Sequence, residues 1–422
     1  MIDSKKLERN WHKKRRKKQS PNSFSAMIEL KNSEDLQKQI PVITEKKLSQ
    51  LLLVCTCILA AQTTNLSTAA KRMSKTLGKI IKFDTAYARL KRFFQTGNSI
   101  GILQFVCILA IKTFCQHSDC YLLLDRTNWK YGKVHINLLV IGLLYRDVFI
   151  PLVWLDLGRA GNSNSKQRLD LLDKLLNWWS LSGVPLPKLY IAGDREFIGF
   201  QWFKGLEDRG IDYVMRIPAS FKLELWFNGK IKDRKLGLKI IQRYLSISGK
   251  DSVEAVLMSE LIVRLTAFDN DSSRGKAKYI FLMTNMEDIT EASKFYRKRY
   301  KIEICFKHLK NSGLRLEELA VQGQHKIDLM FAALTLIYIM SIQKGIIHFE
   351  QIEPQEMKVF YDPKPYIAPA KSVFMQGFEN LLATVFSFEE VFNEIVQLFK
   401  WIAKPQNPLY QHFYTLENFN VQ

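Results

Sequence analysis

The stretch Tyr296–Lys310, which reads YRKRYKIEICFKHLK, is the part of the chain from which the rest can be interpreted. Successive residues of a helix turn by about 100°, so the spacing of Tyr296, Arg299, Glu303 and Lys310 brings all four to one side. Apolar residues form a stripe beside them, at Phe295, Ile302, Phe306 and Leu309. The spacing therefore predicts a helix that packs on a core along one side and carries a polar line next to it.

This predicted helix runs from Asp288 to Ser312, and its charges can be interpreted in two ways. Most charged helices simply expose a solvated face. A single carboxylate, Glu303, between the cations Arg299 and Lys310 is also what a site that handles metal ions and phosphates requires. The rest of the chain has to decide between these two interpretations.

The composition indicates a globular protein with an affinity for polyanions. The chain has 422 residues, of which 47% are hydrophobic and 12% aromatic, enough for roughly two to four structural units. The formal net charge is +21 and the pI is near 9.6. A surface this basic favours nucleic acid as the partner. Ribosomal and membrane-surface proteins share such a charge, but rarely at this length with this much apolar sequence.

Neither the cysteines nor the apolar runs indicate secretion or a membrane. The six cysteines lie mostly in apolar runs and lack a paired C-x2-C spacing, so we interpret them as reduced core residues of a cytoplasmic protein. The stretches Leu51–Ala61, Ile100–Phe114 and Ile327–Ile342 are too short for a span or carry a charge, which predicts buried helices. No apolar run follows the N-terminal charges, as a signal peptide would require.

The N-terminal part divides into a basic tail and a helical domain. Residues 1–23 contain the block His12–Lys18, which is predicted to be disordered by itself and either lies on a phosphate backbone or only solubilises the chain. Residues 24–118 follow a helical pattern. Two short helices with cations at residues 71–75 and 89–92 suggest a helix-turn-helix-like DNA-binding domain, although a helical bundle with basic edges fits equally well.

From Tyr121 the apolar pattern becomes strand-like. Runs at Tyr121–Thr127, Val134–Tyr145 and Asp147–Leu157 are separated by turns and predict an antiparallel meander of three strands. The following segments are a helix from Lys166 to about Trp179 capped by Asn164 or Ser165, a strand at Pro187–Asp194, a short helix through Phe203 and a strand at Asp212–Pro218. This order predicts a mixed α/β fold with a ribonuclease-H-like core at residues 119–218 and 286–345.

The remaining sequence is assigned to an insertion and to a C-terminal region. Residues 219–285 alternate apolar and polar positions, including KIIQRYL at residues 239–245, and predict a mostly β insertion between the fifth strand and the helix with Glu303. A second long buried helix is predicted at His325–His348. Residues 346–422 are predicted to be helical.

Two aspartates end predicted strands, Asp125 in LLLDRTNW and Asp194 in YIAGDREF. Taken singly, each is better interpreted as a turn or a helix cap. Together with Glu303 they would hold two divalent cations roughly 3.5–4 Å apart, an arrangement suited to in-line phosphoryl transfer. Oxygen ligands select Mg²⁺ or Mn²⁺ rather than zinc. Glu196, close behind Asp194, could be a carboxylate that supports the site from outside the metal ligands, but a surface charge is the simpler interpretation.

This set of residues resembles the DDE transposases of bacterial insertion sequences, in particular the family whose third carboxylate lies in a Y-x2-R-x3-E-x6-K signature. The four polar residues of the opening stretch match that signature at every position and spacing. DRTNW around Asp125 and DREF around Asp194 resemble the first two catalytic blocks of the family, and GNSNS at Gly161–Ser165 resembles a stretch common there. The resemblance covers roughly residues 120–345.

The resemblance implies cut-and-paste transposition of double-stranded DNA by a homodimer that brings two inverted-repeat ends together. Asp125, Asp194 and Glu303 would be the catalytic residues and the ligands of two Mg²⁺ or Mn²⁺ ions. Water would nick one strand, and the freed 3′-OH would attack the opposite strand to give a hairpin. The hairpin would then be opened and the ends joined to target DNA. The expected location is the cytoplasm of a bacterium, in association with the nucleoid.

The resemblance also implies contacts to DNA near the cleaved end. Tyr296, Arg299 and Lys310 are expected to hold phosphates there, with Arg299 as a bidentate fork. Lys307, on the same basic helix, is a further candidate for a phosphate contact. Trp226 of the insertion is a candidate for stacking on a flipped base, although packing within the insertion is the simpler interpretation. The C-terminal helices are expected to form the dimer surface.

Two other functions stay open at this point. The chain could be a ribonuclease-H-fold nuclease or resolvase that cuts DNA without joining strands, but the cations and the tyrosine around Glu303 argue against this. It could also be a domesticated DNA-binding protein or a transposition inhibitor without catalytic activity. The presence of all three carboxylates disfavours this second alternative.

Overall fold

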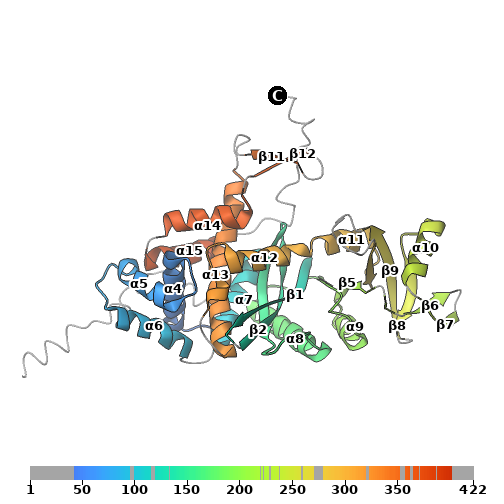
Figure 1. The fold of residues 1–422 in the computed structure, drawn as a ribbon, viewed down its shortest axis with the longest axis horizontal. Coiled ribbons are helices and arrows are strands. Elements are labelled where there is room, and N and C mark those ends of the chain that lie inside the picture. Colours follow the sequence, from blue (N-terminus) through green and yellow to red (C-terminus); the bar gives the residue numbers. More distant parts are fainter. Residues whose placement is uncertain are drawn as a thin grey trace, which may run out of the picture.

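The computed structural model describes residues 42–401, apart from residues 96–98, 116–118, 133, 219, 222, 228–229, 237, 258–259, 270–278, 320–322, 352–356, 362–364, 370 and 386. The predicted basic tail therefore lies outside the described residues. Figure 1 shows a helical bundle at one end of the molecule, a sheet covered by helices in the middle and the insertion at the other end.

The middle of the molecule is a mixed sheet whose first five strands have the order β3-β2-β1-β4-β5. The antiparallel meander consists of β1 (Cys120–Tyr131), β2 (Val134–Tyr145) and β3 (Val148–Asp156). Two further strands, β4 (Leu189–Gly193) and β5 (Asp212–Ile217), add to β1 in parallel. This is the strand order of a ribonuclease-H-like core, which confirms the predicted fold class.

Helices cover both faces of this core. Two of them, α8 (Ser165–Ser182) and α9 (Phe200–Glu207), connect β3 to β4 and β4 to β5 and lie together below the sheet in Figure 1. On the other face run α11 (Ile289–Arg297) and α12 (Tyr300–Asn311). The start of α8 is a capping box in which the Asn164 side chain accepts a hydrogen bond from the Gln167 amide at 2.8 Å. The cap is therefore Asn164 rather than Ser165.

The predicted single helix Asp288–Ser312 is wrong in one respect, because it is broken into α11 and α12. The amides of Lys298 and Arg299 donate to carbonyl oxygens three residues back, at 3.0 and 2.9 Å, in two tight turns between the helices. The apolar pattern continues across such turns, so the sequence does not reveal them. As a consequence, Arg299 lies at the start of α12.

The insertion extends the same sheet, with the order β5-β10-β9-β8-β6-β7 and antiparallel pairing throughout. Its strands are β6 (Leu223–Phe227), β7 (Lys230–Leu236), β8 (Val253–Leu257), β9 (Leu261–Asp269) and β10 (Tyr279–Thr284). The segment KIIQRYL, which we predicted as part of this β region, lies instead in a helix, α10 (Leu238–Ser248). Its apolar residues at Ile240, Ile241 and Tyr244 also fit a helical period.

The helical bundle combines both ends of the chain. Its members are α4 (Glu45–Ala61), α5 (Leu66–Thr76), α6 (Phe83–Gln95), α7 (Ile100–Phe114), α13 (Gln324–Phe349), α14 (Val373–Thr384) and α15 (Phe388–Lys400). The buried helix α13 contacts α4, α6, α7, α14, α15 and the edge strand β3. The predicted C-terminal helical region also contains a hairpin, β11 (Met357–Tyr361) paired with β12 (Pro365–Pro369), which the prediction missed.

Helix α13 is the one helix in the described part of the chain that is by itself long and apolar enough to cross a membrane, and two bent helix pairs would pass the same test as broken spans. In the fold, 89% of its most apolar window is buried. Packing on the surrounding helices and on β3 accounts for this all-round apolar surface. The six cysteines are free and buried, as predicted.

Candidate catalytic site

The pairing of β1 with β4 brings the two predicted aspartates to neighbouring positions. The last parallel pair is Leu124 with Gly193, and Asp125 and Asp194 are the next residues on the two strands. Neighbouring strands lie about 4.8 Å apart, so the two carboxylates emerge at the same point of the sheet. Asp194 follows its strand directly, as predicted. Asp125 does not end a strand, since β1 continues to Tyr131 in its pairing with β2; only the pairing with β4 ends there.

Arg299 connects Asp125 to Glu303. Its Nη1 donates to Oδ2 of Asp125 at 2.8 Å, and its Nη2 donates to Oε1 of Glu303 at 2.6 Å. The side chains of Arg299 and Asp125 are 13% and 16% exposed, whereas Glu303 is 56% exposed. Glu303 therefore joins the aspartates at the surface of the site, and the guanidinium stands between the two carboxylates.

Asp194 has two partners of its own. The Tyr296 hydroxyl donates to its Oδ1 at 3.4 Å, and Nη1 of Arg216 lies 3.6 Å from the same oxygen. Arg216 comes from β5 and was not among the predicted site residues. A single cation in the otherwise apolar end of the strand, YVMRI, was the available signal. The three parallel strands β1, β4 and β5 thus supply Asp125, Asp194 and Arg216 to one site.

Burial dominates the electrostatics of Asp125. It raises the pKa of this carboxyl to about 6, and the negative charges of Glu196 and Glu303 act in the same direction. The charge of Arg299 and the hydrogen bond from the Arg126 amide oppose the rise. A carboxylate in this position therefore requires a cation beside it.

The other side chains of the site respond to these carboxylates. Burial by itself would lower the pKa of Arg299, but Asp125, Tyr296, Asp194 and Glu303 hold it above its ordinary value. Burial and the charge of Asp194 raise the pKa of Tyr296 to about 12. At neutral pH Arg299 is consequently a cation and Tyr296 keeps its phenolic proton.

Lys310 lies further along α12 and has other partners. Its Nζ donates to the backbone oxygen of Asn128 at 2.7 Å and lies 3.0 Å from Oε1 of Glu317 in the short 3₁₀ helix Leu316–Glu318. It also lies 6.0 Å from the centre of the Trp129 ring, which is buried. In this structure Lys310 therefore fastens α12 to β1.

Two further DNA contacts were predicted, at Lys307 and Trp226. Lys307 is exposed on α12. Trp226 belongs to β6, but its side chain is outside the described part of the structure, so the stacking role stays a prediction. His308, to which no role was assigned, is buried against α14, where its ring stacks on Phe374 at 4.5 Å.

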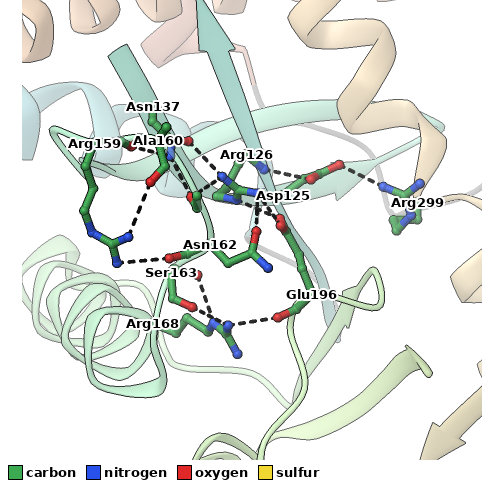
Figure 2. Close-up of polar contacts among 11 residues, drawn as sticks. Asp125, Arg126, Asn137, Arg159, Ala160, Asn162, Ser163, Arg168, Glu196 and Arg299 are labelled. Atoms are coloured by element: carbon green, nitrogen blue, oxygen red, sulfur yellow. Dashed lines mark hydrogen bonds and ion pairs between the residues drawn. The ribbon is translucent and has the colours of Figure 1, made fainter. Parts of the chain in front are cut away.

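Arg126, the residue after Asp125, lies at the centre of a polar network that the sequence did not reveal (Figure 2). Arg126 donates through Nε to Oε1 of Glu196 at 2.9 Å and through Nη2 to the other oxygen of the same carboxylate. Its Nη1 also donates to Oδ1 of Asn137 at 3.1 Å and to the carbonyl of Gly161 at 2.6 Å, and its Nη2 to Oδ1 of Asn162 at 2.9 Å. One side chain therefore holds the GNSNS loop against the loop after Asp194.

The interpretation of Glu196 as a surface charge is wrong. Its side chain is 18% exposed and that of Arg126 is 13% exposed, and breaking an ion pair this buried costs about 3–5 kcal/mol. A second cation, Arg168 of α8, is 3% exposed and donates to the backbone oxygens of Ser163 and Glu196 at 2.5 and 2.9 Å. Its partners are 5 and 28 residues away along the chain, so both loops depend on it.

The three-carboxylate metal site stays a prediction. Among the described residues, no three His, Cys, Asp or Glu side chains are grouped as the ligands of one metal ion. The donor chemistry itself suits a divalent cation, because oxygens of Asp125 and Glu303 flank one cationic group. That cationic group is the guanidinium of Arg299.

A cavity of about 580 Å³ lies between the insertion and α11. Its lining includes Lys250, Lys294 and Arg297. The Arg297 guanidinium carbon lies over the Phe268 ring, 4.4 Å from the ring centre. None of the three carboxylates lines this cavity. Three cations and one carboxylate, Asp251, therefore line a hollow between α11 and the insertion.

One comparison with known proteins assigns the chain to a family. The sequence profile of the family described as "Transposase DDE domain" matches residues 117–340, more than half of the chain, and the chain therefore belongs to this family. The matched span contains Asp125, Asp194 and Glu303, so the DDE transposase prediction is confirmed at this level. The match does not single out an insertion-sequence family, and the Y-R-E-K subgroup stays a prediction.

Similarity to other proteins is low. A similar solved structure is the "Cryo-EM structure of piggyBac transposase synaptic complex with hairpin DNA", at 10% identity and a TM-score of 0.38, over 86% of this chain and 77% of that one. The comparison with curated proteins gave no match. The family assignment accordingly rests on the profile match, and the fold on the strand order.

Proposed function

We propose that this transposase performs cut-and-paste transposition of an insertion sequence, with Asp125, Asp194 and Glu303 as its catalytic carboxylates. The observation that carries the proposal is the juxtaposition of the three: the strand register puts Asp125 beside Asp194, and Arg299 links Asp125 to Glu303. The chain's charge of +21 supports DNA as the substrate.

The proposed chemistry is a series of phosphodiester substitutions at the terminal inverted repeats. In the first, the oxygen of water bonds to phosphorus, the bond to the 3′ oxygen breaks, and a 3′-OH is released. In strand transfer the freed 3′-OH attacks a phosphodiester of target DNA, and the target's own 3′ oxygen leaves. Bound Mg²⁺ or Mn²⁺ would supply charge neutralisation and a lowered pKa of water, with Asp125, Asp194 and Glu303 as the ligands.

The protein's own residues would position the DNA end. Arg299 has a planar fork that fits two phosphate oxygens, and the Tyr296 hydroxyl keeps a proton that it can donate. Lys310 would add a point charge to the same strand. Exposed cations on α5 and α6 and in the cavity beside α11 would hold the flanking duplex. We further propose a homodimer in the complex with DNA and a location with the bacterial nucleoid.

The test is cleavage of duplex DNA that carries the two flanks of this protein's own gene, with Mg²⁺ or Mn²⁺. Loss of one carboxylate removes several kcal/mol of transition-state stabilisation, so Glu303→Gln should cut at least about 100-fold more slowly while it still binds DNA. The matched control is Glu260→Gln, because Glu260 is 52% exposed and pairs with Lys204 at 2.6 Å, much as Glu303 pairs with Arg299. This control should cut like the wild type.

The products separate the proposed function from its alternatives. Cuts at both flanks followed by joined products support a transposase. Cuts without joining would indicate a nuclease, and binding without cutting by the wild type would indicate a domesticated DNA-binding protein. Equal cleavage by wild type and Glu303→Gln would contradict the assignment of the carboxylates.

A further inference from the structure

The contacts of Arg299 point to the order in which DNA and the divalent cation bind. This inference rests on the proposed function. We propose that Arg299 is an internal counter-ion that keeps the carboxylates Asp125 and Glu303 closed to divalent cations until DNA is bound. When DNA binds, the Arg299 guanidinium exchanges its two carboxylate partners for a phosphate of the DNA. The two carboxylates then take up the cation in its place.

The first step of the argument is competition for the same oxygens. The fork of Arg299 uses both terminal nitrogens, one on Oδ2 of Asp125 at 2.8 Å and one on Oε1 of Glu303 at 2.6 Å. A divalent cation that bound both oxygens would lie at the place of the guanidinium. The guanidinium and a divalent cation cannot occupy this place together, because both are positively charged. Solvent screens their repulsion poorly here, since the side chains of Asp125 and Arg299 are only 16% and 13% exposed.

The second step is that phosphate is a suitable competitor for Arg299. A guanidinium binds phosphate through the same two parallel hydrogen bonds that it makes to carboxylates. Glu303, one of its present partners, is 56% exposed, so this side of the site is open to a DNA backbone. Lys310, by contrast, is already held by the Asn128 carbonyl and by Glu317.

The third step is what the loss of Arg299 does to Asp125. A carboxylate this buried is costly to keep ionised without a cation at hydrogen-bond distance. Arg216 already has a carboxylate partner, since its guanidinium lies 3.6 Å from Asp194. When Arg299 moves to a phosphate, Asp125 is left without its counter-ion, and the binding of another cation beside it becomes more favourable. Coupling of this kind is reciprocal: DNA tightens the binding of the metal, and the metal tightens the binding of DNA by the same factor.

The test measures Mn²⁺ binding by the purified full chain, from the electron paramagnetic resonance signal of free Mn²⁺. Without DNA, Arg299→Gln should bind Mn²⁺ at least about tenfold more tightly than the wild type. The matched control is Arg209→Gln, because Arg209 makes a similar two-pronged pair, at 2.7 and 2.8 Å, with Asp173, which is not one of the catalytic carboxylates. This control should bind Mn²⁺ like the wild type.

A second titration adds a 30-base-pair duplex that carries one flank of the gene, after subtraction of Mn²⁺ bound by the duplex alone. The duplex should tighten Mn²⁺ binding at least about fivefold more in the wild type than in Arg299→Gln, in which the site is already open. Arg299→Lys keeps the charge but reaches only one carboxylate, so its Mn²⁺ affinity without DNA should be intermediate. Thermal melting checks that each variant is folded, and Arg299→Lys carries the test if the glutamine variant is not.

Two outcomes would overturn the inference, and they differ in what they mean for the proposed function. If wild type and Arg299→Gln bind Mn²⁺ equally without DNA, and Asp125→Asn abolishes the binding in both, the site exists but Arg299 does not close it. If no protein shows Mn²⁺ binding that depends on Asp125, with or without DNA, the proposed metal chemistry of these carboxylates falls as well.

Discussion

Single buried polar side chains determine how the elements of this transposase dock. His308 on α12 is an example: it is 8% exposed, its Nε2 lies 3.3 Å from the Ser372 hydroxyl at the start of α14, and its Nδ1 has no partner among the described residues. Burial, and secondarily the charge of Lys307, lowers its pKa to about 4. The imidazole is therefore neutral in the folded protein at neutral pH.

This depressed pKa predicts a loss of stability in acid. Between pH 6.5 and pH 4 the unfolded chain binds a proton at His308 that the folded chain does not, so the free energy of unfolding falls as the pH falls. The contribution is about 3 kcal/mol over this range. His308→Phe keeps the stacking on Phe374 and removes the titration, so it should lose about 3 kcal/mol less than the wild type.

Denaturant unfolding at pH 7, 5.5 and 4 measures this difference. The comparison of the two proteins cancels the acid sensitivity of the other groups. Parallel stability curves for wild type and His308→Phe would show that His308 accepts its proton in the folded state as readily as in the unfolded one.

At the scale of elements, the contact between α13 and α14 depends on two glycines. A Cβ at Gly377 would lie 1.7 Å from the carbonyl oxygen of Ser341, and a Cβ at Gly345 would lie 1.9 Å from that of Val373. The two backbones therefore touch where the helices cross. Since α13 also contacts the N-terminal helices and β3, this crossing fixes the C-terminal helices to the rest of the fold.

Gly377→Ala should therefore separate the two helices. The obstructing atoms are backbone atoms that cannot rotate away, so we expect a loss of about 3 kcal/mol or more, measured by thermal or denaturant unfolding. Gly183→Ala is the matched control, because Gly183 has φ of 72° but nothing within 4 Å of the added Cβ. It should cost only about 1–2 kcal/mol of backbone strain. Equal losses would show that the helices move apart without penalty.

The break between α11 and α12 has a consequence for the site. Because the chain turns at Lys298 and Arg299, α11 presents Tyr296 to Asp194 while α12 presents Glu303 beside Arg299. A single straight helix was expected to carry all four signature residues on one line. Instead the structure divides them: Tyr296, Arg299 and Glu303 face the aspartates, and Lys310 binds β1 and the 3₁₀ helix.

At the scale of the whole molecule, the net charge of +21 predicts DNA binding that weakens steeply with salt. Each phosphate contact adds about 0.9 to the slope of log affinity against log salt concentration. Lys71, Arg72 and Lys75 are exposed on α5. If α5 lies on DNA, replacing the three by glutamine should make the slope shallower by up to about 3.

Fluorescence anisotropy of a labelled duplex at several salt concentrations measures this slope. The control replaces three exposed lysines elsewhere, Lys166, Lys188 and Lys204, which are 82%, 41% and 44% exposed. It removes the same charge and should change the slope much less. Equal changes would mean that charge alone, rather than α5, governs binding.

The sequence by itself determined which segments form the strands β1 to β5, in which order they follow one another, and which three carboxylates are the catalytic candidates. These features depend on local patterns: apolar runs that form β1 to β5, and aspartates that follow apolar residues at Asp125 and Asp194. The signature around Glu303 is also local, so its residues were found from their spacing and from the resemblance to the transposase family. The family match then confirmed the class of protein.

Only the tertiary structure decided which of these residues touch. Arg126 and Glu196 are 70 residues apart and Arg299 and Asp125 are 174 residues apart, so no local pattern relates them. The same holds for Arg216 beside Asp194, and for the C-terminal helices packed on N-terminal ones. The guanidinium between Asp125 and Glu303 is the clearest case. The sequence predicted that these carboxylate oxygens bind metal ions, whereas in the fold, where α12 packs on β1, they accept hydrogen bonds from Arg299.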